Sequence, residues 1–458
     1  MTPRTHETQN RPRILVVGGG YVGMYAARRL QRKLRPDEAT VTVVDPQPNM
    51  TYQPFLPEAA AGSIEARHVV VPLRKVLKKC RVLTGEVSAV DHGRKVATVA
   101  PPEGEPFGLP YDVLVMAPGS VSRTLPVPGL AEMGIGFKTV GEAIHLRNHV
   151  LSRLDLASVT DDPRRRREAL TFVFVGGGYA GVEVFAELED MARYALRSYP
   201  ELSPKEMRWV LVEATGRILP EVGLPMGEYT VDRLRERGME VRLETRVESM
   251  VDGRVVLTDG EEFGAETIVW TTGVKANPLV ARSGLPVDEK GRLICTPELR
   301  VEHVEDAWSA GDCAAVPDLS KDGPGALCAP SAQHAVRQAK RLADNVVAIL
   351  RGGKTRAYIH ADVGSVASLG LHKGVAEVYG VKLKGLPAWF MHRAYHLSRM
   401  PTVGHKARVA ADWAMALFFG REVVSLGQVQ HPRREWEWAA RGAEQPVDPS
   451  GTGRSWVR

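Results

Sequence analysis

Two glycine-rich turns have the residue types and the spacing that bind the phosphates of a dinucleotide. The pattern G-x-G-x-x-G occurs at Gly18, Gly20 and Gly23 and again at Gly176, Gly178 and Gly181. Small residues in such a turn let the backbone approach a pyrophosphate, and the amino-terminal end of the following helix favours its negative charge. Two dinucleotides in one chain would suit hydride transfer between a nicotinamide and a flavin.

A carboxylate follows each turn at the end of the next apolar run. Asp45 ends the run VTVVD after the first turn, and Glu213 ends the run RWVLVE after the second. An acidic side chain at this place can accept hydrogen bonds from the hydroxyls of a ribose. The gap before Glu213 is longer than usual, because the segment RSYPELSPKEM inserts a loop between helix and strand.

Three shorter turns also follow apolar runs. They contain Ala117 and Gly119 after YDVLVM, Gly273 after ETIVW, and Asp312 after DAWSAG. A carboxylate after a tight turn could bind a polyol, but each turn taken singly is more typical of an ordinary loop.

The elements that must position these turns alternate between strand and helix. Ile14–Val17 and the run TFVFV before the second turn are short and uninterrupted, as expected of parallel strands covered on both faces. A helical pattern follows each of them. The sequence therefore predicts an α/β fold with two Rossmann-like dinucleotide-binding domains.

A further helix is expected to begin near Ser331, in SAQHAVRQAKRLADNVVAIL. At 100° per residue, Gln333, His334, Arg337 and Gln338 share one polar arc, and alanine, valine and leucine fill the opposite face. Periodicity alone predicts a half-buried helix with a solvated polar face.

Composition limits the classes of protein and partner. The chain has 458 residues, 44% hydrophobic and 25% charged, which is typical of a globular protein of two or three domains. A net charge of +6 with acidic residues between the basic ones argues against a nucleic-acid partner but is compatible with an anionic membrane surface. No apolar run is long enough to predict a transmembrane helix, and residues 1–11 lack the apolar region of a signal peptide.

The cysteines are far apart in the sequence and form no CxxC pair. They are Cys80, Cys295, Cys313 and Cys328. This spacing predicts neither a zinc site nor a redox disulfide, and it favours a reducing compartment. The sequence predicts no metal site.

Taken together, the paired glycine motifs, the short turns and the Ala-Gly-Asp segment resemble the two-dinucleotide flavoprotein disulfide-reductase superfamily. The segments TYQPFLPEAAAGSI, SAQHAVRQAKRLADN and GSVASLG narrow the resemblance to the type II, non-proton-pumping NADH dehydrogenases, over roughly residues 12 to 427. The absence of a CxxC pair agrees with the quinone-reducing branch. The resemblance implies an FAD-dependent oxidation of NADH with two-electron reduction of a membrane quinone.

The resemblance also implies which residues bind each cofactor. For FAD these are Gly18, Gly20, Gly23, Asp45, Gln53, Pro54, Ala117, Gly119 and Asp312. For NADH or NAD these are Gly176, Gly178, Gly181, Glu183, Glu213 and Gly273.

In this family the motif A-Q-x-A-x-x-Q lines the quinone site, and here it is matched by Ala332, Gln333, Ala335 and Gln338. Amide side chains both donate and accept hydrogen bonds, so they can hold a quinone or a quinol. The resemblance makes Gln333, Gln338 and Glu183 the candidate catalytic residues, with Glu183 near the two rings, where it positions the nucleotide or relays protons. Without the resemblance, Glu183 is equally well explained as an acid stabilised by a helix amino terminus.

The last quarter of the chain combines basic and aromatic residues across Trp389–Arg421. We expect two short helices, broken at Pro401 and Gly404, that lie on an anionic lipid surface. A dimer-forming or core helix pair is the alternative. The basic residues are Arg393, Arg399, Lys406, Arg408 and Arg421, against one acid, Asp412.

The predicted organisation divides the FAD-binding domain around the NAD-binding domain. Residues 1–125 and 276–355 form the FAD-binding domain, 126–275 the NAD-binding domain, 356–430 the membrane-associating region and 431–458 a disordered tail. The implied location is peripheral, on the cytoplasmic face of the cell membrane. The sequence is compatible with a homodimer. The alternatives are a soluble reductase that passes electrons to a small redox protein, and a flavoprotein that binds nucleotide without turnover.

Overall fold

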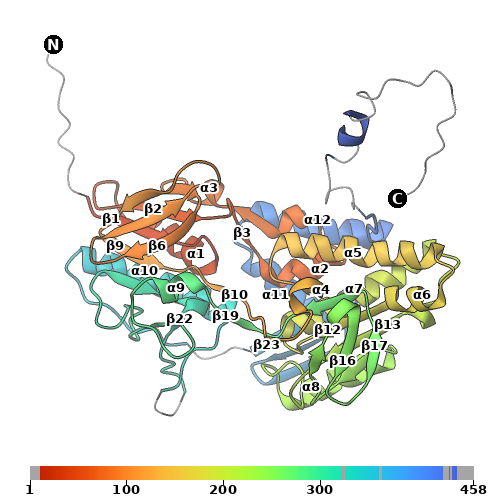
Figure 1. Cartoon of the computed structure of the whole chain (residues 1–458). Helices are drawn as coiled ribbons and strands as arrows, with labels where there is room; N and C mark the ends of the chain where they lie inside the picture. The colour runs from red at the N-terminus through yellow and green to blue at the C-terminus, as the bar shows by residue number, and fades with distance from the viewer. Residues whose placement is uncertain are drawn as a thin grey trace, which may run out of the picture.

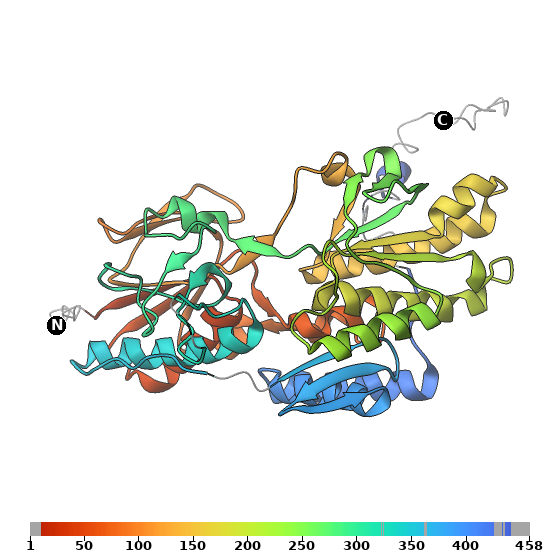
Figure 2. The ribbon, with the colours of Figure 1, turned by 90° about the horizontal axis from the view of Figure 1, so that it is seen from below.

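The computed structural model describes residues 11–321, 323, 325–360, 364–425, 433 and 436–440. Figures 1 and 2 show two lobes, each built on a parallel sheet, with the carboxyl-terminal helices packed along them. Most of the tail predicted at 431–458 lies outside the described residues, and residues 436–440 within it are helical.

The first lobe contains five parallel strands from distant parts of the chain. Their order is β21 (Ala307–Ser309), β9 (Val113–Met116), β1 (Arg13–Val17), β2 (Thr40–Asp45) and β5 (Arg81–Thr84). Helix α1 (Tyr21–Lys33) packs against α10 (Ala332–Leu350). The sheet therefore joins the amino-terminal segment to one that follows it by nearly 300 residues.

The second lobe repeats this arrangement with an uninterrupted stretch of chain. Its parallel order is β11 (Gly134–Gly136), β18 (Thr267–Trp270), β12 (Thr171–Val175), β13 (Arg208–Val212) and β14 (Glu240–Arg242). The helices of this lobe are α5 (Val140–Val159), α6 (Pro163–Ala169), α7 (Tyr179–Ala195) and α8 (Leu224–Glu236). Where the chain leaves the first lobe and returns to it, β10 (Ser120–Ser122) and β19 (Val274–Ala276) pair antiparallel.

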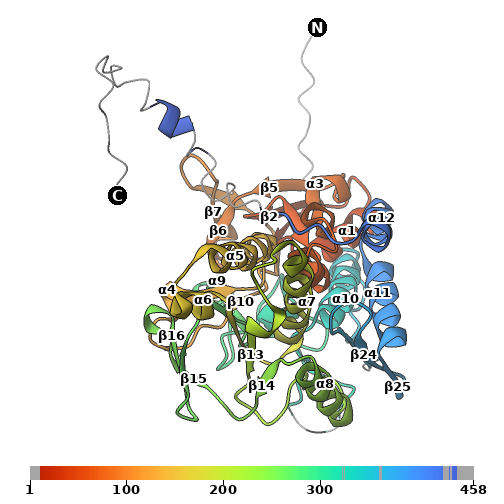
Figure 3. The same cartoon turned by 90° about the vertical axis from the view of Figure 1, so that its right-hand side faces the viewer.

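The carboxyl-terminal segment is a three-stranded antiparallel sheet followed by two helices. It comprises β23 (Gly364–Ser368), β24 (Gly374–Val378), β25 (Val381–Lys384), α11 (Leu386–Arg399) and α12 (Val403–Phe419). Figure 3 shows α11 and α12 together at one edge of the molecule. The predicted break at Pro401 is confirmed, but the predicted break at Gly404 is wrong, because this residue lies in the first turn of α12.

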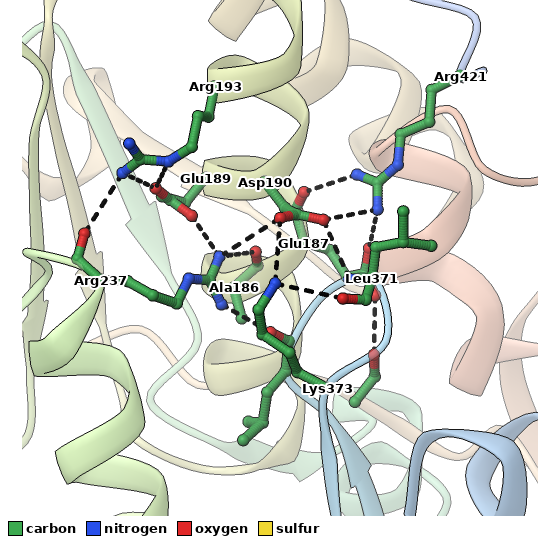
Figure 4. Close-up of polar contacts among 11 residues, drawn as sticks. Ala186, Glu187, Glu189, Asp190, Arg193, Arg237, Leu371, Lys373 and Arg421 are labelled. Atoms are coloured by element: carbon green, nitrogen blue, oxygen red, sulfur yellow. Dashed lines mark hydrogen bonds and ion pairs between the residues drawn. The ribbon is translucent and has the colours of Figure 1, made fainter. Parts of the chain in front are cut away.

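Buried ion pairs hold this segment against the rest of the chain. Arg393 of α11 contacts Glu58 of α2 (Leu56–Ala60) at 2.8 Å. Arg421 contacts Asp190 of α7 at 2.9 Å and lies 3.4 Å from Glu187. Figure 4 shows the acids of α7 between Arg421 and other cations. The expectation that Arg393 and Arg421 face lipid is therefore wrong, since both side chains are paired inside the protein.

Candidate functional site

The first glycine turn forms a cradle between β1 and α1. Gly18 has a φ of +99°, in the region that favours glycine, and a Cβ on Gly23 would overlap the carbonyl oxygen of Gly18. Above Gly20 the space is open, because a Cβ built there meets no described atom within 4 Å. No side chain of the described residues caps α1, so its first amide groups are available to an anion.

The carboxyl ends of three parallel strands meet at this cradle. Asp45 at the end of β2 accepts a 2.6 Å hydrogen bond from the amide of Gly19. Burial raises the pKa of Asp45, while the amides of Gly19 and Gln47 act against this effect. The turn with Ala117 and Gly119 follows β9 and the Asp312 turn follows β21, so neighbouring strands place both beside the glycines.

A chain of polar contacts extends from Asp312 toward the predicted residues Gln53 and Pro54. Ser120 donates to Oδ2 of Asp312 at 2.7 Å, and Nζ of Lys138 donates to Oγ of Ser120 at 2.9 Å. The Gln53 amide donates to the Lys138 carbonyl at 3.4 Å, and Pro54 follows in the same short 3-10 helix. Burial lowers the pKa of Lys138, although the Asp312 carboxylate favours its charged form. Lys138 could not be identified from the sequence, because nothing in its local pattern indicates a cofactor-binding residue.

The second glycine turn has the same construction between β12 and α7. Gly176 has a φ of +114°, a Cβ on Gly181 would overlap the Gly176 carbonyl oxygen, and the space above Gly178 is open within the described residues. Glu213 accepts from the amide of Gly177 at 2.6 Å, as Asp45 does from Gly19 in the first cradle. Among the described residues, no side chain caps α7.

Two further residues complete the second cradle. Thr215 donates through its amide and its hydroxyl to Oε1 of Glu213, both at 2.8 Å. Gly273 follows β18 with a φ of +99°, and a Cβ there would meet no described atom within 4 Å. A carboxylate has about four acceptor positions. Glu213 therefore keeps acceptor capacity for a ribose after these backbone contacts.

Helix α10 begins where the sequence predicts, with the Ser331 hydroxyl accepting from the amide of His334. The predicted solvated polar arc is wrong in part, because His334 and Gln338 are buried. Gln338 accepts a 2.8 Å hydrogen bond from the amide of Gly311, so it fixes the turn that carries Asp312. The half-buried Gln333 donates to the carbonyl of Gly364 in β23 at 3.1 Å. Ala332 and Ala335 lie in the same first turns of α10.

Glu183 is buried within α7 and faces the carboxyl-terminal segment. It accepts from the Ser368 amide in β23 at 2.9 Å, and its carboxylate lies 3.1 Å from Nε2 of His392 in α11. Burial acts to lower the pKa of His392, but the hydrogen bond and charge of Glu183, with the charges of Glu58 and Glu187, raise it overall. The site thus contains a buried carboxylate and imidazole that can hold a proton between them.

The pairing of Glu183 with His392 could not be found from the sequence, because the two residues are about 200 positions apart and no periodicity relates them. Burial and the charge of His392 lower the pKa of the neighbouring His396 well below its ordinary value. One strand, β23, contacts both Gln333 and Glu183. It therefore joins the residues that the sequence assigned separately to quinone and to nucleotide.

Comparisons with known proteins agree with this geometry. A family model described as pyridine nucleotide-disulphide oxidoreductase matches residues 12–339. The chain is 30% identical over 392 residues to the type II NADH:quinone oxidoreductase of Staphylococcus saprophyticus, covering 84% of this chain and 94% of that protein. It is 28% identical over 441 residues to the type II NADH:quinone oxidoreductase Ndh of Mycobacterium tuberculosis, covering 92% of each.

A solved structure shares the fold. NDH2 from Plasmodium falciparum in complex with NADH superposes with a TM-score of 0.85, covering 91% of this chain and all of that one, at 18% identity. The likeness extends over both lobes and into the carboxyl-terminal segment, since the coverage exceeds the range of the family model.

The raised pKa of His392 predicts a specific dependence of stability on pH. The contribution of its charged form should be complete below about pH 6.5, the pKa of an unfolded imidazole, and should be lost as the pH rises through the higher pKa of the folded protein. We expect His392→Gln to remove this part of the pH dependence of the free energy of unfolding, measured by urea denaturation of the holoprotein. The exposed His303 provides the control His303→Gln. Parallel pH profiles for the parent and His392→Gln would contradict the pairing.

Proposed function

The chain belongs to the pyridine nucleotide-disulphide oxidoreductase family and, within it, to the type II NADH:quinone oxidoreductases, and from this membership we propose how its sites perform the reaction. The protein oxidises NADH and reduces a quinone by two electrons without pumping protons. FAD, when bound, accepts a hydride and passes two electrons to the quinone. The observation that carries the proposal is the pair of matching cradles, each with an open anion site and a carboxylate at its rim.

The first cradle holds FAD in this proposal, and the second holds NADH. The amide groups at Gly20 and Gly178 would each contact a pyrophosphate, and Asp45 and Glu213 would each accept hydrogen bonds from a ribose. Asp312, supported by Ser120, would contact the flavin nucleotide at the strand ends. Ala117, Gly119, Gln53 and Pro54 complete the FAD residues, and Gly273 completes those for NADH.

We assign different roles to the two glutamines of α10. Gln333 would contact the quinone directly, because it is half-buried and its only support is the Gly364 carbonyl and Arg337 among the described residues. Gln338 is a positioning residue, since its oxygen already accepts from Gly311 next to Asp312. Ala332 and Ala335, the other two residues that the resemblance implies for quinone, lie in the same first turns of α10.

Glu183 is proposed to hold a proton close to the ring of the nucleotide, together with His392. Both side chains are buried, and the two acceptor positions of Glu183 on Oε1 are used by Ser368 and His392. A quinone that accepts two electrons also takes up two protons, so a buried acid and imidazole beside the site can supply one of them.

The assignment of Glu213 to the ribose of NADH predicts a preference between nucleotides. Its negative charge at the ribose should repel a 2′-phosphate, so NADH should be preferred to NADPH in kcat/KM. Glu213→Gln should narrow this preference mainly by improving the use of NADPH, because the amide keeps the shape of the side chain and removes the charge. Steady-state kinetics with both nucleotides measures the effect. An equal or better kcat/KM with NADPH in the parent protein would contradict the role of Glu213.

The quinone assignment predicts a separation of the two half-reactions. Gln333→Leu should slow the reoxidation of the bound flavin by a short-chain quinone at least about tenfold, the loss expected when one hydrogen bond of 1.4 kcal/mol is removed, while reduction by NADH stays nearly unchanged. Stopped-flow absorbance of the flavin follows both steps. The matched control is Ile349→Ala at the exposed far end of α10. Equal slowing of both steps by Gln333→Leu would indicate a structural role instead.

We propose that the edge formed by α11 and α12 attaches the enzyme to lipid. Within the described residues, no helix has the length and apolar character needed to cross a membrane. Large apolar side chains are exposed along this edge, although Trp389 is buried and Trp413 is half-buried with its indole donating to Glu58. They are Leu386, Phe390, Met391, Val403, Met415, Leu417, Phe418 and Phe419. An exposed apolar surface of this extent is typical of an interaction site.

Basic residues border this apolar edge. Arg399 and Arg408 are exposed, and Lys406 is half-buried. The turn between α11 and α12 also contacts the basic face of α1, where Tyr25 donates to the Arg399 carbonyl and Arg28 donates to the Pro401 carbonyl. Apolar side chains bordered by cations suit a surface of anionic lipid. Attachment to the cytoplasmic face of the membrane and formation of a homodimer remain predictions from the sequence.

Leu417, Phe418 and Phe419 should anchor the protein, since each is more than 70% exposed and burial of such a side chain is worth roughly 1.5–3 kcal/mol. Replacing all three with Ser should abolish sedimentation with anionic liposomes in high salt and leave NADH oxidation with a water-soluble quinone intact. The control replaces the exposed Val159 and Leu224 of the second lobe with Ser. Point substitutions are preferable to truncation after Leu383, which would leave Glu58 without Arg393. Unchanged sedimentation of the triple variant would contradict lipid attachment through α12.

A further inference from the structure

Three buried side chains of different types meet beside the amino-terminal end of α10. Asp318, Cys328 and His334 each offer one ligand atom, and these atoms lie within 4.8 Å of one another. All three residues are less than 8% exposed. A carboxylate, a thiol and an imidazole are the groups that bind transition metals in proteins, so their convergence in the interior requires an explanation.

Backbone pairing fixes the first two of these residues opposite each other. The segment that contains Asp318 runs antiparallel to the segment that contains Cys328, with a bridge between Pro317 and Leu327. The amide of Asp318 donates to Ala326 at 2.8 Å, and the amide of Cys328 donates to Val316 at 2.9 Å. The thiol and carboxylate are therefore held by two strands of a hairpin, not by a single flexible loop.

The third residue is oriented from the other side. His334 lies in the first turn of α10, and its Nδ1 is 2.9 Å from the hydroxyl of Tyr358. Tyr358 is itself fixed through its amide, which donates to the Pro297 carbonyl at 2.8 Å. A hydrogen bond to one ring nitrogen sets the tautomer and aims the other nitrogen, which is how ligand histidines are usually held. The ring of His360 lies 5.9 Å from that of His334, centre to centre.

We propose that Asp318, Cys328 and His334 bind one divalent transition-metal ion, with Zn²⁺ the best match, and that His360 or a water supplies the fourth ligand. Zinc prefers four nitrogen, sulfur and oxygen ligands at about 2.0–2.3 Å, which places neighbouring ligand atoms roughly 3.5 Å apart. The separations here are at most 4.8 Å, so side-chain rotations bring the atoms to that distance.

Other uses of the three groups fit the contacts less well. Oδ1 of Asp318 accepts from the hydroxyl of Ser320 at 2.6 Å, and Oδ2 lies 3.4 Å from Nζ of Lys321, so Oδ2 keeps a second acceptor position for a metal. The thiol lies 3.7 Å from the Pro317 carbonyl. A nucleophilic cysteine needs access to its substrate, whereas Cys328 is 7% exposed. A thiolate enclosed with a histidine and a carboxylate is the pattern of a closed structural site.

A metal at this place would join the hairpin to the helix that bears Gln333. His334 follows Gln333 directly in the sequence, and the hairpin follows the turn that carries Asp312. The ion would therefore fix the amino-terminal end of α10 relative to both the FAD cradle and the proposed quinone contact. Metal binding by these three side chains does not require the proposed reaction, because it depends on the ligand groups alone.

The test measures metal in the full-length holoprotein, produced without a polyhistidine tag and purified without chelators. Inductively coupled plasma mass spectrometry should find about one zinc per chain, and Cys328→Ser should lower this at least about tenfold. The matched control is Cys80→Ser, which removes a partly buried thiol that contacts Ala27 and Gln31 in the first lobe. Its zinc content should equal that of the parent.

Spectroscopy provides a readout that is independent of activity. After removal of zinc by a chelator, added Co²⁺ should produce a thiolate-to-metal charge-transfer band in the parent and in Cys80→Ser but not in Cys328→Ser. FAD content reports folding of each variant. If Cys328→Ser does not fold, Asp318→Asn retains the thiol and should bind Co²⁺ at least about tenfold more weakly. A parent protein with less than about a tenth of an equivalent of metal and no cobalt band would overturn the proposal.

Discussion

Pairing of buried carboxylates with cations from the carboxyl-terminal segment is the constraint on which the rest of the structure depends. Glu58, Glu183 and Glu187 are each at most 6% exposed, on helices α2 and α7, which pack against each other. A charge removed from water costs several kcal/mol unless a partner compensates it. Arg393, His392 and Arg421 provide this compensation. The carboxyl-terminal segment is thus required to compensate the buried charges where α2 packs against α7.

Helix α7 connects the chemistry of the site with this docking. Its amino-terminal end forms the second cradle at Gly178, its second turn carries Glu183, and its middle carries Glu187 and Asp190. Strand β23 makes the complementary connection, since Gly364 contacts Gln333 and Ser368 contacts Glu183. The residues proposed for nucleotide and quinone therefore share two elements with the docking residues, which explains how they are held together although they come from distant parts of the chain.

Local sequence patterns predicted the two glycine cradles but not the ion pairs between residues far apart in the sequence, and both outcomes have one physical reason. A glycine turn, its strand and its acid lie within a short stretch, so Gly18 to Asp45 contain all the geometry that the turn needs. Glu58 and Arg393 are 335 positions apart, and nothing near either residue indicates the other. The same limit placed Arg393 and Arg421 among the cations of the predicted membrane surface, whereas both are interior. It also concealed the burial of Gln338, whose side-chain oxygen accepts from the amide of Gly311, 27 positions earlier.

The docking cations follow both lobes in the sequence, and this order has a consequence for biosynthesis. A ribosome releases the two nucleotide lobes first, and domains commonly fold in the order in which they emerge. Arg393 and Arg421 emerge after both lobes, when Glu58 and Asp190 can already occupy folded helices. The apolar edge of α11 and α12 is consequently assembled after the lobes that support it, so the lipid attachment proposed for this edge would be gained late in synthesis.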